Sequence, residues 1–165
     1  MRKILLLSDT HGHLDQKIFK YLDTVDEVWH AGDIGTGEVC RQLEKVKPLK
    51  AVYGNIDGTE LRKTYPENNI FYCEGVKVFI THIGGYPGRY NAEAKKIIKA
   101  EKPALFICGH SHILKVMYDK ENDLLHLNPG AAGMHGFHVV KTLLRFCIDG
   151  SEIKNMEIIE LGKRA

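Results

Sequence analysis

The fold class is decided near the N-terminus by the stretch Ile4-Leu5-Leu6-Leu7-Ser8-Asp9-Thr10-His11-Gly12. Four consecutive apolar residues followed at once by polar ones are typical of a short strand that is covered on both faces. Apolar residues then recur at a spacing of four over residues 14–22, which predicts a helix. Strands at 27–30 and 50–53, with an amphipathic helix at 37–46 between them, continue the alternation. This order predicts a parallel sheet with right-handed crossovers.

The second half of the chain favours antiparallel strands. Residues 70–73 and 76–81 form a predicted hairpin through Glu74-Gly75. A helix at 91–100 and an apolar strand at 104–108 follow. Four later runs are predicted to be successive antiparallel strands: 116–118, 124–127, 139–148 and 153–159. We therefore expect an α/β fold with two sheets packed face to face, the later sheet being largely antiparallel.

Length and composition limit the possible function classes. A chain of 165 residues corresponds to one domain, which we expect to span residues 1–165. With 44% hydrophobic and 27% charged residues, a disordered or fibrous protein is excluded. The net charge of +2 gives no support for nucleic acid or an anionic membrane as a partner, and no apolar run is long enough for a signal peptide or a membrane span. The four cysteines form no Cys-x-x-Cys pair, so we expect buried free thiols and a cytoplasmic location.

Polar residues follow the predicted core strands at the point where each strand ends. Because the carboxyl ends of parallel strands meet at one edge of an open α/β sheet, we expect these side chains to converge. Glycines beside them allow tight turns and a close approach of the backbone. The residues able to bind metal at these strand ends are Asp9, His11, Asp33, Asn55, His82, His110 and His112.

This set of residue types indicates a metal site. Carboxylates and imidazoles gathered in a partly buried place need a counter-charge. Carboxylate, amide and imidazole ligands without thiolates suit Mn²⁺, Fe²⁺, Co²⁺, Ni²⁺ or Zn²⁺, and we expect Mn²⁺. Seven ligands exceed what one tetrahedral ion uses, so we expect two ions, as in two-metal hydrolytic sites. Asp33 follows the middle one of the first three strands and is the expected bridging ligand.

The remaining histidines and one arginine fall outside these positions. His30 precedes the Gly32-Asp33 pair, where it either orients a ligand or only packs. Arg89, in the glycine-rich segment 84–89, either contacts the phosphate of a substrate or is an exposed loop residue. Four histidines are predicted to be surface or packing residues: His13, His126, His135 and His138.

The ordered motifs match a known pattern over residues 3 to 130. They are Asp9-x-His11, Gly32-Asp33, Gly54-Asn55-x-Asp57, His82 and Gly109-His110-x-His112. In this order they resemble the calcineurin-like metallophosphoesterase superfamily. The short chain, its Ser-Asp-Thr-His-Gly start and the Asn128-Pro129-Gly130 segment are similar to the small YfcE-type phosphodiesterases of that superfamily. The resemblance implies a four-layer α/β/β/α sandwich of two mixed sheets.

The resemblance also implies an activity and a division of the ligands. It implies a metal-dependent phosphoesterase, most directly a phosphodiesterase, in which a metal-bridging hydroxide attacks phosphorus in line. The expected catalytic residues are Asp33, Asn55 and His82, the expected partner is a small phosphoester substrate, and a homodimer or homotetramer is implied. By the resemblance one ion is held by Asp9, His11, Asp33 and His112, and the other by Asp33, Asn55, His82 and His110.

One position departs from the pattern of the superfamily. Many members carry a histidine after the Gly-Asn pair that protonates the leaving group, whereas this chain has Ile56. Isoleucine cannot donate a proton, so we expect esters with a good leaving group, such as aryl phosphodiesters. Asp57 either organises Asn55 or caps the following turn. Two alternatives stay open: a phosphomonoesterase of the same chemistry, and a metal-poor binding scaffold similar to the retromer subunit of this fold, against which the complete ligand set argues.

Overall fold

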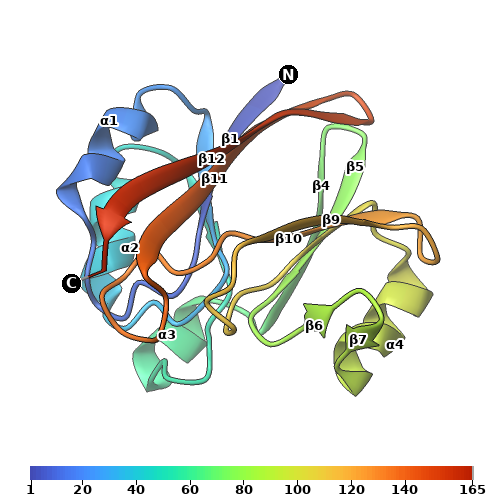
Figure 1. Cartoon of the computed structure of the whole chain (residues 1–165), viewed down its shortest axis with the longest axis horizontal. Coiled ribbons are helices and arrows are strands. Elements are labelled where there is room, and N and C mark those ends of the chain that lie inside the picture. Colours follow the sequence, from blue (N-terminus) through green and yellow to red (C-terminus); the bar gives the residue numbers. More distant parts are fainter. Residues whose placement is uncertain (165) are drawn as a thin grey trace.

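Two five-stranded sheets pack face to face in the computed structural model, which describes residues 1–164 (Figure 1). The order of the first sheet is β12-β11-β1-β2-β3, and that of the second is β4-β5-β8-β10-β9. The first sheet consists of β1 (Arg2–Leu7), β2 (Glu27–His30), β3 (Leu49–Ala51), β11 (Val140–Asp149) and β12 (Glu152–Lys163). The second consists of β4 (Asn68–Cys73), β5 (Val76–Thr81), β8 (Leu105–Ile107), β9 (Lys115–Asp119) and β10 (Leu124–Asn128).

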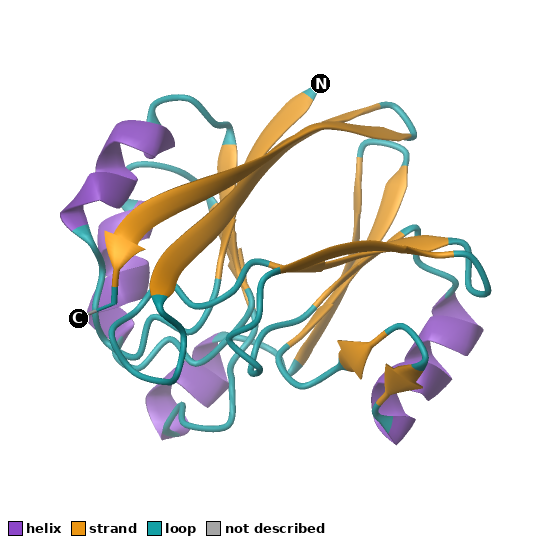
Figure 2. Cartoon of the chain, viewed as in Figure 1, coloured by secondary structure: helices purple, strands orange, loops and turns teal. Residues whose placement is uncertain are grey.

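Helices cover the outer faces of both sheets (Figure 2). A 3₁₀ turn, η1 (Gln16–Ile18), leads into the short α1 (Phe19–Leu22), which lies with α2 (Gly37–Glu44) beside the first sheet. On the other side of the molecule, α4 (Ala92–Glu101) covers the second sheet, next to the small hairpin of β6 (Gly85–Tyr86) and β7 (Arg89–Tyr90). The remaining helix is α3 (Thr59–Thr64).

Three buried clusters separate four layers. Because successive side chains of a strand point to opposite faces, Leu5 and Leu7 of β1 pack with the residues of α1 and α2, whereas Ile4 and Leu6 pack with the second sheet. On the far side of the second sheet, Phe79 packs with the apolar residues of α4. This confirms the predicted α/β/β/α sandwich of two mixed sheets.

The first three strands are parallel as predicted, with β2 between β1 and β3. The prediction of four successive antiparallel strands was wrong at one step. β9 and β10 pair antiparallel, but β11 leaves the second sheet and pairs antiparallel with β1, while β10 pairs parallel with β8. β11 pairs with the edge of β1 that does not contact β2. This pairing buries the apolar residues of β11 between the layers. Strand patterns do not show which edge a distant hairpin will join.

The structure differs from the predicted elements at three other places. Residues 14–22 form η1 and a single turn of α1 instead of one helix, because Asp15 accepts a hydrogen bond from the backbone of Lys17 and caps the 3₁₀ turn. Neither α3 nor the β6–β7 hairpin was predicted.

The state of the cysteines agrees with the sequence analysis. All four cysteines are free and buried, as predicted. Within residues 1–164, every helix is too short or too polar to pass through a lipid bilayer.

Candidate metal centre

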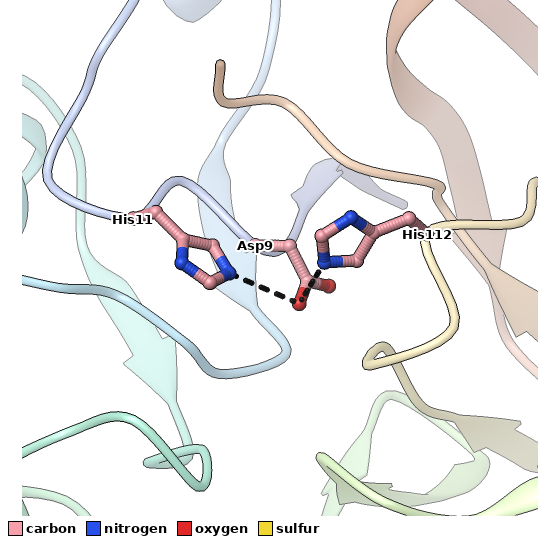
Figure 3. Close-up of side chains that lie close together, drawn as sticks. All are labelled: Asp9, His11 and His112. Carbon is pink, nitrogen blue, oxygen red and sulfur yellow. Dashed lines mark ion pairs between the residues drawn. The ribbon is translucent and has the colours of Figure 1, made fainter. Parts of the chain in front are cut away.

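The loops after the carboxyl ends of β1, β2, β3, β5 and β8 bring the predicted ligands together. Six of the seven form two groups, and within each group the donor atoms lie within 4.8 Å of one another. In the first group (Figure 3), Nε2 of His112 lies 3.1 Å and Nε2 of His11 lies 3.9 Å from Oδ1 of Asp9. The second group consists of Asp33, His82 and His110. The seventh residue, Asn55, places its Oδ1 3.0 Å from Nδ1 of His110 and so joins the second group.

Asp33 lies between the two groups. Its Oδ2 is 3.4 Å from Nε2 of His11 in the first group and 3.2 Å from Nε2 of His82 in the second. Its Oδ1 accepts a hydrogen bond of 3.1 Å from the backbone N–H of Ile56, which fixes the carboxylate in this orientation. One carboxylate oxygen of Asp33 therefore approaches a histidine of each group.

Three buried donor atoms at this place make no hydrogen bond to the described part of the chain: Oδ1 of Asp9, Nε2 of His11 and Nε2 of His82. They approach their neighbours closely but are not aligned toward them. Buried polar atoms without partners are costly, and a cation removes that cost. The donor set therefore fits divalent metal ions.

In two of the ligands, Asp9 and His82, the second polar atom of the side chain is held by hydrogen bonds within the protein. Oδ2 of Asp9 accepts hydrogen bonds from the Ser8 hydroxyl at 2.6 Å and from the backbone of His110 at 3.1 Å. Nδ1 of His82 lies 2.7 Å from the carbonyl oxygen of Ala31, to which it donates. Such a bond fixes the tautomer and leaves the lone pair on Nε2 for a metal ion.

The ionisation of Asp9, Asp33 and His11 favours a bound cation. Burial disfavours the charged form of Asp9, but the adjoining imidazoles of His112 and His82 outweigh it and lower the pKa of Asp9. Burial opposes the charge of Asp33 in the same way, and the contact with His82 lowers the pKa of this carboxyl as well. Burial lowers the pKa of His11, despite the nearby carboxylates, which favours a neutral ring able to bind metal.

Five of the predicted ligands have a left-handed backbone. Nine non-glycine residues within 1–164 have a positive φ, and this group includes Asp9, His11, Asp33, His110 and His112, with φ between 46° and 71°. Each such residue costs about 1 kcal/mol or more, and strained residues of this kind cluster at functional sites.

The motif glycines lie against the ligand side chains. A Cβ atom on Gly32 would fall 2.6 Å from Nδ1 of His82, and one on Gly109 would fall 2.8 Å from Oδ2 of Asp9. These contacts confirm the close backbone approach predicted from the sequence.

Asp57 ties two ligand loops together. Its buried carboxylate accepts hydrogen bonds from the backbone N–H groups of Ile34 at 3.1 Å, Gly35 at 2.8 Å and Gly54 at 2.8 Å. Ile34 follows Asp33, and Gly54 precedes Asn55. Of the two alternatives for Asp57, the structure supports the organising role and extends it to the loop of Asp33.

His30 is buried and connects the loops after β1 and β2. Its Nδ1 accepts from the backbone N–H of Gly32 at 3.1 Å, so its Nε2 donates to the Thr10 hydroxyl at 3.0 Å. The same hydroxyl donates to the carbonyl of Ile34 at 2.8 Å. Burial lowers the pKa of His30 to about 4 and keeps the ring neutral. His30 therefore positions the ligand loops rather than only packing.

A cavity of about 550 Å³ is lined by five of the predicted ligands and also by residues not predicted for the site; the five are His11, Asp33, Asn55, His110 and His112. The ring of His135 stacks on His11 with centroids 4.8 Å apart, and His138 meets His112 edge to face at 5.3 Å. Both were predicted to be surface or packing residues, but they line the cavity wall. Nothing in their local sequence marks them, because a remote loop contact brings them there. His13 is exposed and His126 is buried, in agreement with the prediction.

Ile56 and Arg89 line two different cavities. Ile56 lines the same cavity as the ligands, where the histidine of many superfamily members would stand. Arg89 lines a neighbouring cavity that shares His110 with the metal centre.

Comparisons with known proteins identify the family of the chain. Residues 2–151 match the model of the calcineurin-like phosphoesterase superfamily domain. Over 163 residues the chain is 27% identical to a probable metallophosphoesterase of Methanothermobacter thermautotrophicus, covering 95% of this chain and 91% of that protein.

Solved structures share the fold. The structure of an archaeal phosphodiesterase superposes with a TM-score of 0.76 at 26% identity, covering 96% of this chain and 99% of that one. Chaetomium thermophilum Vps29 has the same TM-score at 16% identity, covering 99% and 100% of the two chains, which shows the fold alone. Because the family model spans most of the chain, this protein belongs to the calcineurin-like phosphoesterase superfamily.

Proposed function

We propose that this protein is a phosphodiesterase that uses two divalent metal ions, Mn²⁺ being the expected choice, to hydrolyse esters with a good leaving group. The observation that carries the proposal is the position of Asp33, whose Oδ2 contacts one histidine of each ligand group. The likeness to an archaeal phosphodiesterase supports the same class of reaction.

The chain supplies the holding and orienting groups for this chemistry. Divalent ions held by Asp9, Asp33 and the ligand histidines would supply Lewis acidity, which would stabilise charge on phosphate oxygens and make water acidic enough to act as the nucleophile near neutral pH. Asp9 and Asp33 remain ionised because their pKa values are lowered, and they hold the positive charge in place. His82 is oriented by the carbonyl of Ala31. No protein nucleophile is required.

The absence of a proton donor at position 56 sets the expected preference for the leaving group of the substrate. Ile56 lines the cavity and offers no proton, so the leaving group has to depart as a stable anion. General acid catalysis typically contributes ~10²–10⁴-fold, which esters of poor leaving groups would lose here. Esters of aryl alcohols therefore fit better than esters of alkyl alcohols. The fold likeness to Vps29 keeps a metal-poor scaffold as the second candidate.

The test begins with protein from which metal has been removed by chelation. We expect hydrolysis of bis-p-nitrophenyl phosphate only after Mn²⁺ or Ni²⁺ is added, with a higher kcat/KM than for p-nitrophenyl phosphate. Asp33→Ala is expected to lower this rate by about 10²-fold or more, since a removed charge stabiliser typically costs that much. The exposed Asp23→Ala is the matched control.

Elemental analysis separates the enzyme from the scaffold. The wild-type protein is expected to hold close to two ions per chain after loading, and Asp33→Ala fewer. A metal content near zero, or turnover that is independent of added metal, would reject the proposal.

A further inference from the structure

A second cavity, of about 290 Å³, opens beside the metal centre; we call it the lateral cavity. It shares His110, Ser111 and Ile113 with the cavity that contains the metal ligands. A group attached to a phosphate at the metal centre therefore has a direct route into it. Its further lining includes Ile83, Tyr86, Arg89, Lys115 and His126.

The walls of the lateral cavity expose apolar side chains. Ile83, Tyr86 and Ile113 are 42%, 41% and 61% exposed; the first two lie in the segment between β5 and α4, and the third in the loop after β8. The Lys115 ammonium lies 4.1 Å from the centroid of the Tyr86 ring, a cation–π contact that holds the ring in place. A pocket with apolar walls and a few polar groups is the usual form of a small-molecule site.

The charge of the lateral cavity favours an anion. Arg89 and Lys115 both line it, and its described lining contains no carboxylate. A neighbouring cavity, which shares Ile83 and Asn91 with the lateral cavity, differs, since Glu67 and Glu93 line it together with Arg62. An apolar group carried on a phosphate is thus better accommodated in the lateral cavity.

The wall and the floor of the lateral cavity are fixed. The β6–β7 hairpin, which carries Tyr86, is anchored where the Tyr90 hydroxyl donates to Asp119 at 2.6 Å and where the Cys108 thiol donates to the carbonyl of Gly85 at 3.3 Å. Beneath it, the fully buried ring of His126 packs against Phe106 at 5.3 Å between centroids. Neither ring nitrogen of His126 has a hydrogen-bond partner among the described residues.

We propose that the lateral cavity binds the retained ester group of the substrate, and that this group is a planar aromatic ring. This inference rests on the proposed function, in which the phosphate lies at the metal centre next to His110. Tyr86 and Ile113 provide the flat apolar walls, and Arg89 and Lys115 attract the phosphate that carries the ring. The cavity thus makes the enzyme selective for diesters with an aromatic retained group over those with a small alkyl group.

The test compares two diesters that release the same p-nitrophenolate: bis-p-nitrophenyl phosphate and methyl p-nitrophenyl phosphate. The chemical step is alike, so a difference in KM reports on the retained group. We expect Tyr86→Ala to raise the KM of the aryl diester by about fivefold to tenfold, the size of one lost aromatic contact, and to change that of the methyl diester by less than about twofold. Tyr86→Phe is expected to behave like the wild type.

Tyr72→Ala is the matched control, because Tyr72 is also exposed and lies under a lysine, Lys77, but belongs to the edge strand β4. Equal losses on both diesters in Tyr86→Ala, or an unchanged aryl preference, would overturn the proposal.

A binding measurement keeps this inference separate from the proposed activity. Calorimetric titration of the Mn²⁺-loaded wild type should show phenylphosphonate binding about fivefold or more tightly than methylphosphonate, and Tyr86→Ala should remove the difference. If no diester is hydrolysed but this preference is present, the proposed activity fails and the aromatic site stands. Equal affinities of the two phosphonates in the wild type would reject the aromatic site, whatever the activity.

Discussion

The backbone of Gly54 lies against the carboxylate of Asp33 so closely that a Cβ atom at position 54 would fall 2.1 Å from Oδ1 of Asp33. Side-chain atoms essentially never approach that closely, so the carboxylate or the loop would have to move. The glycine before Asn55 is therefore needed for the position of the shared ligand, and not only for a turn.

We expect Gly54→Ala to impair the metal centre. Displacing Asp33 separates the ligand groups that it contacts, so activity should fall by about 10²-fold, a typical loss when a charge-stabilising group is misplaced. The assay is Mn²⁺-dependent hydrolysis of bis-p-nitrophenyl phosphate, with metal content measured in parallel. Gly58→Ala is the control, because nothing lies within 4 Å of a Cβ at that position. Similar rates for the two variants would contradict the role given to Gly54.

Asp57→Asn should lower both stability and metal affinity. The substitution keeps the shape but replaces one accepting oxygen with a donor that faces backbone N–H groups. We expect the free energy of unfolding to fall by about 2 kcal/mol or more, since unsatisfied buried groups cost about 1–3 kcal/mol each. Chemical denaturation of the chelated protein measures this, and the exposed Asp23→Asn should change little.

Thr10 and His30 should show strong coupling in a double-mutant cycle. The imidazole donates to the Thr10 hydroxyl, which donates to Ile34, so either single change leaves a buried partner unpaired. Thr10→Val with His30→Phe should destabilise by less than the sum of the single changes, with a coupling of about 1 kcal/mol or more. Additive losses would show that the pair does not act as one network.

His126→Phe should stabilise the protein, and more so in acid. Burial lowers the pKa of His126 to about 4, against 6.5 for an unperturbed histidine, although the nearby Phe106 carbonyl acts in the opposite direction. Protonation therefore favours the unfolded state, and stability is lost as the pH falls from 6.5 toward 4. By pH 5 this loss amounts to about 2 kcal/mol, which the variant avoids.

The comparison for His126 uses denaturation of chelated protein at pH 7.5 and pH 5. At pH 7.5 we expect the variant to gain about 1 kcal/mol, because an unpaired buried imidazole is replaced by an apolar ring. The control variant is His13→Phe, because His13 is exposed. If the difference in free energy of unfolding between the variant and the wild type were no larger at pH 5 than at pH 7.5, His126 would not be held neutral in the folded state.

Metal should stabilise the folded chain. Carboxylates and imidazoles that lie unpaired at the centre gain a counter-ion, so Mn²⁺ added to the chelated protein should raise Tm. At a free concentration of ~100 times Kd, the stabilisation is about 2.7 kcal/mol per site. Calorimetric scans with and without Mn²⁺ measure the shift. Asp33→Ala should show a much smaller shift, and Asp23→Ala the full one.

The candidate ligands were predictable because the relevant rule is local. Each of them follows a short apolar run, and the carboxyl ends of such strands meet at one edge of a sheet. His110 and His112 lie about a hundred positions from Asp9 and still reach it, because β8 and β1 end in the same region. Residue type then indicated the chemistry, since carboxylates and imidazoles without thiolates favour divalent metal ions.

The contribution of residues 131–138 was not predictable in the same way. Backbone N–H groups of Ala132 and Gly133 donate to the carbonyls of Ser8 at 2.9 Å and Asp9 at 3.1 Å, which places His135 and His138 on the cavity wall. These bonds join segments far apart in the chain. No periodicity or motif encodes them.

The sequence by itself determined that the first three strands are parallel, which residues can donate to a metal ion, and that Ile56 replaces the usual histidine, since these depend on residue type and on short-range pattern. Only the tertiary structure decided that β11 returns to β1, and that Asp57 and His30 hold the ligand loops. The reason is that long-range pairing and buried hydrogen bonds depend on which surfaces remain free once the rest of the chain has packed.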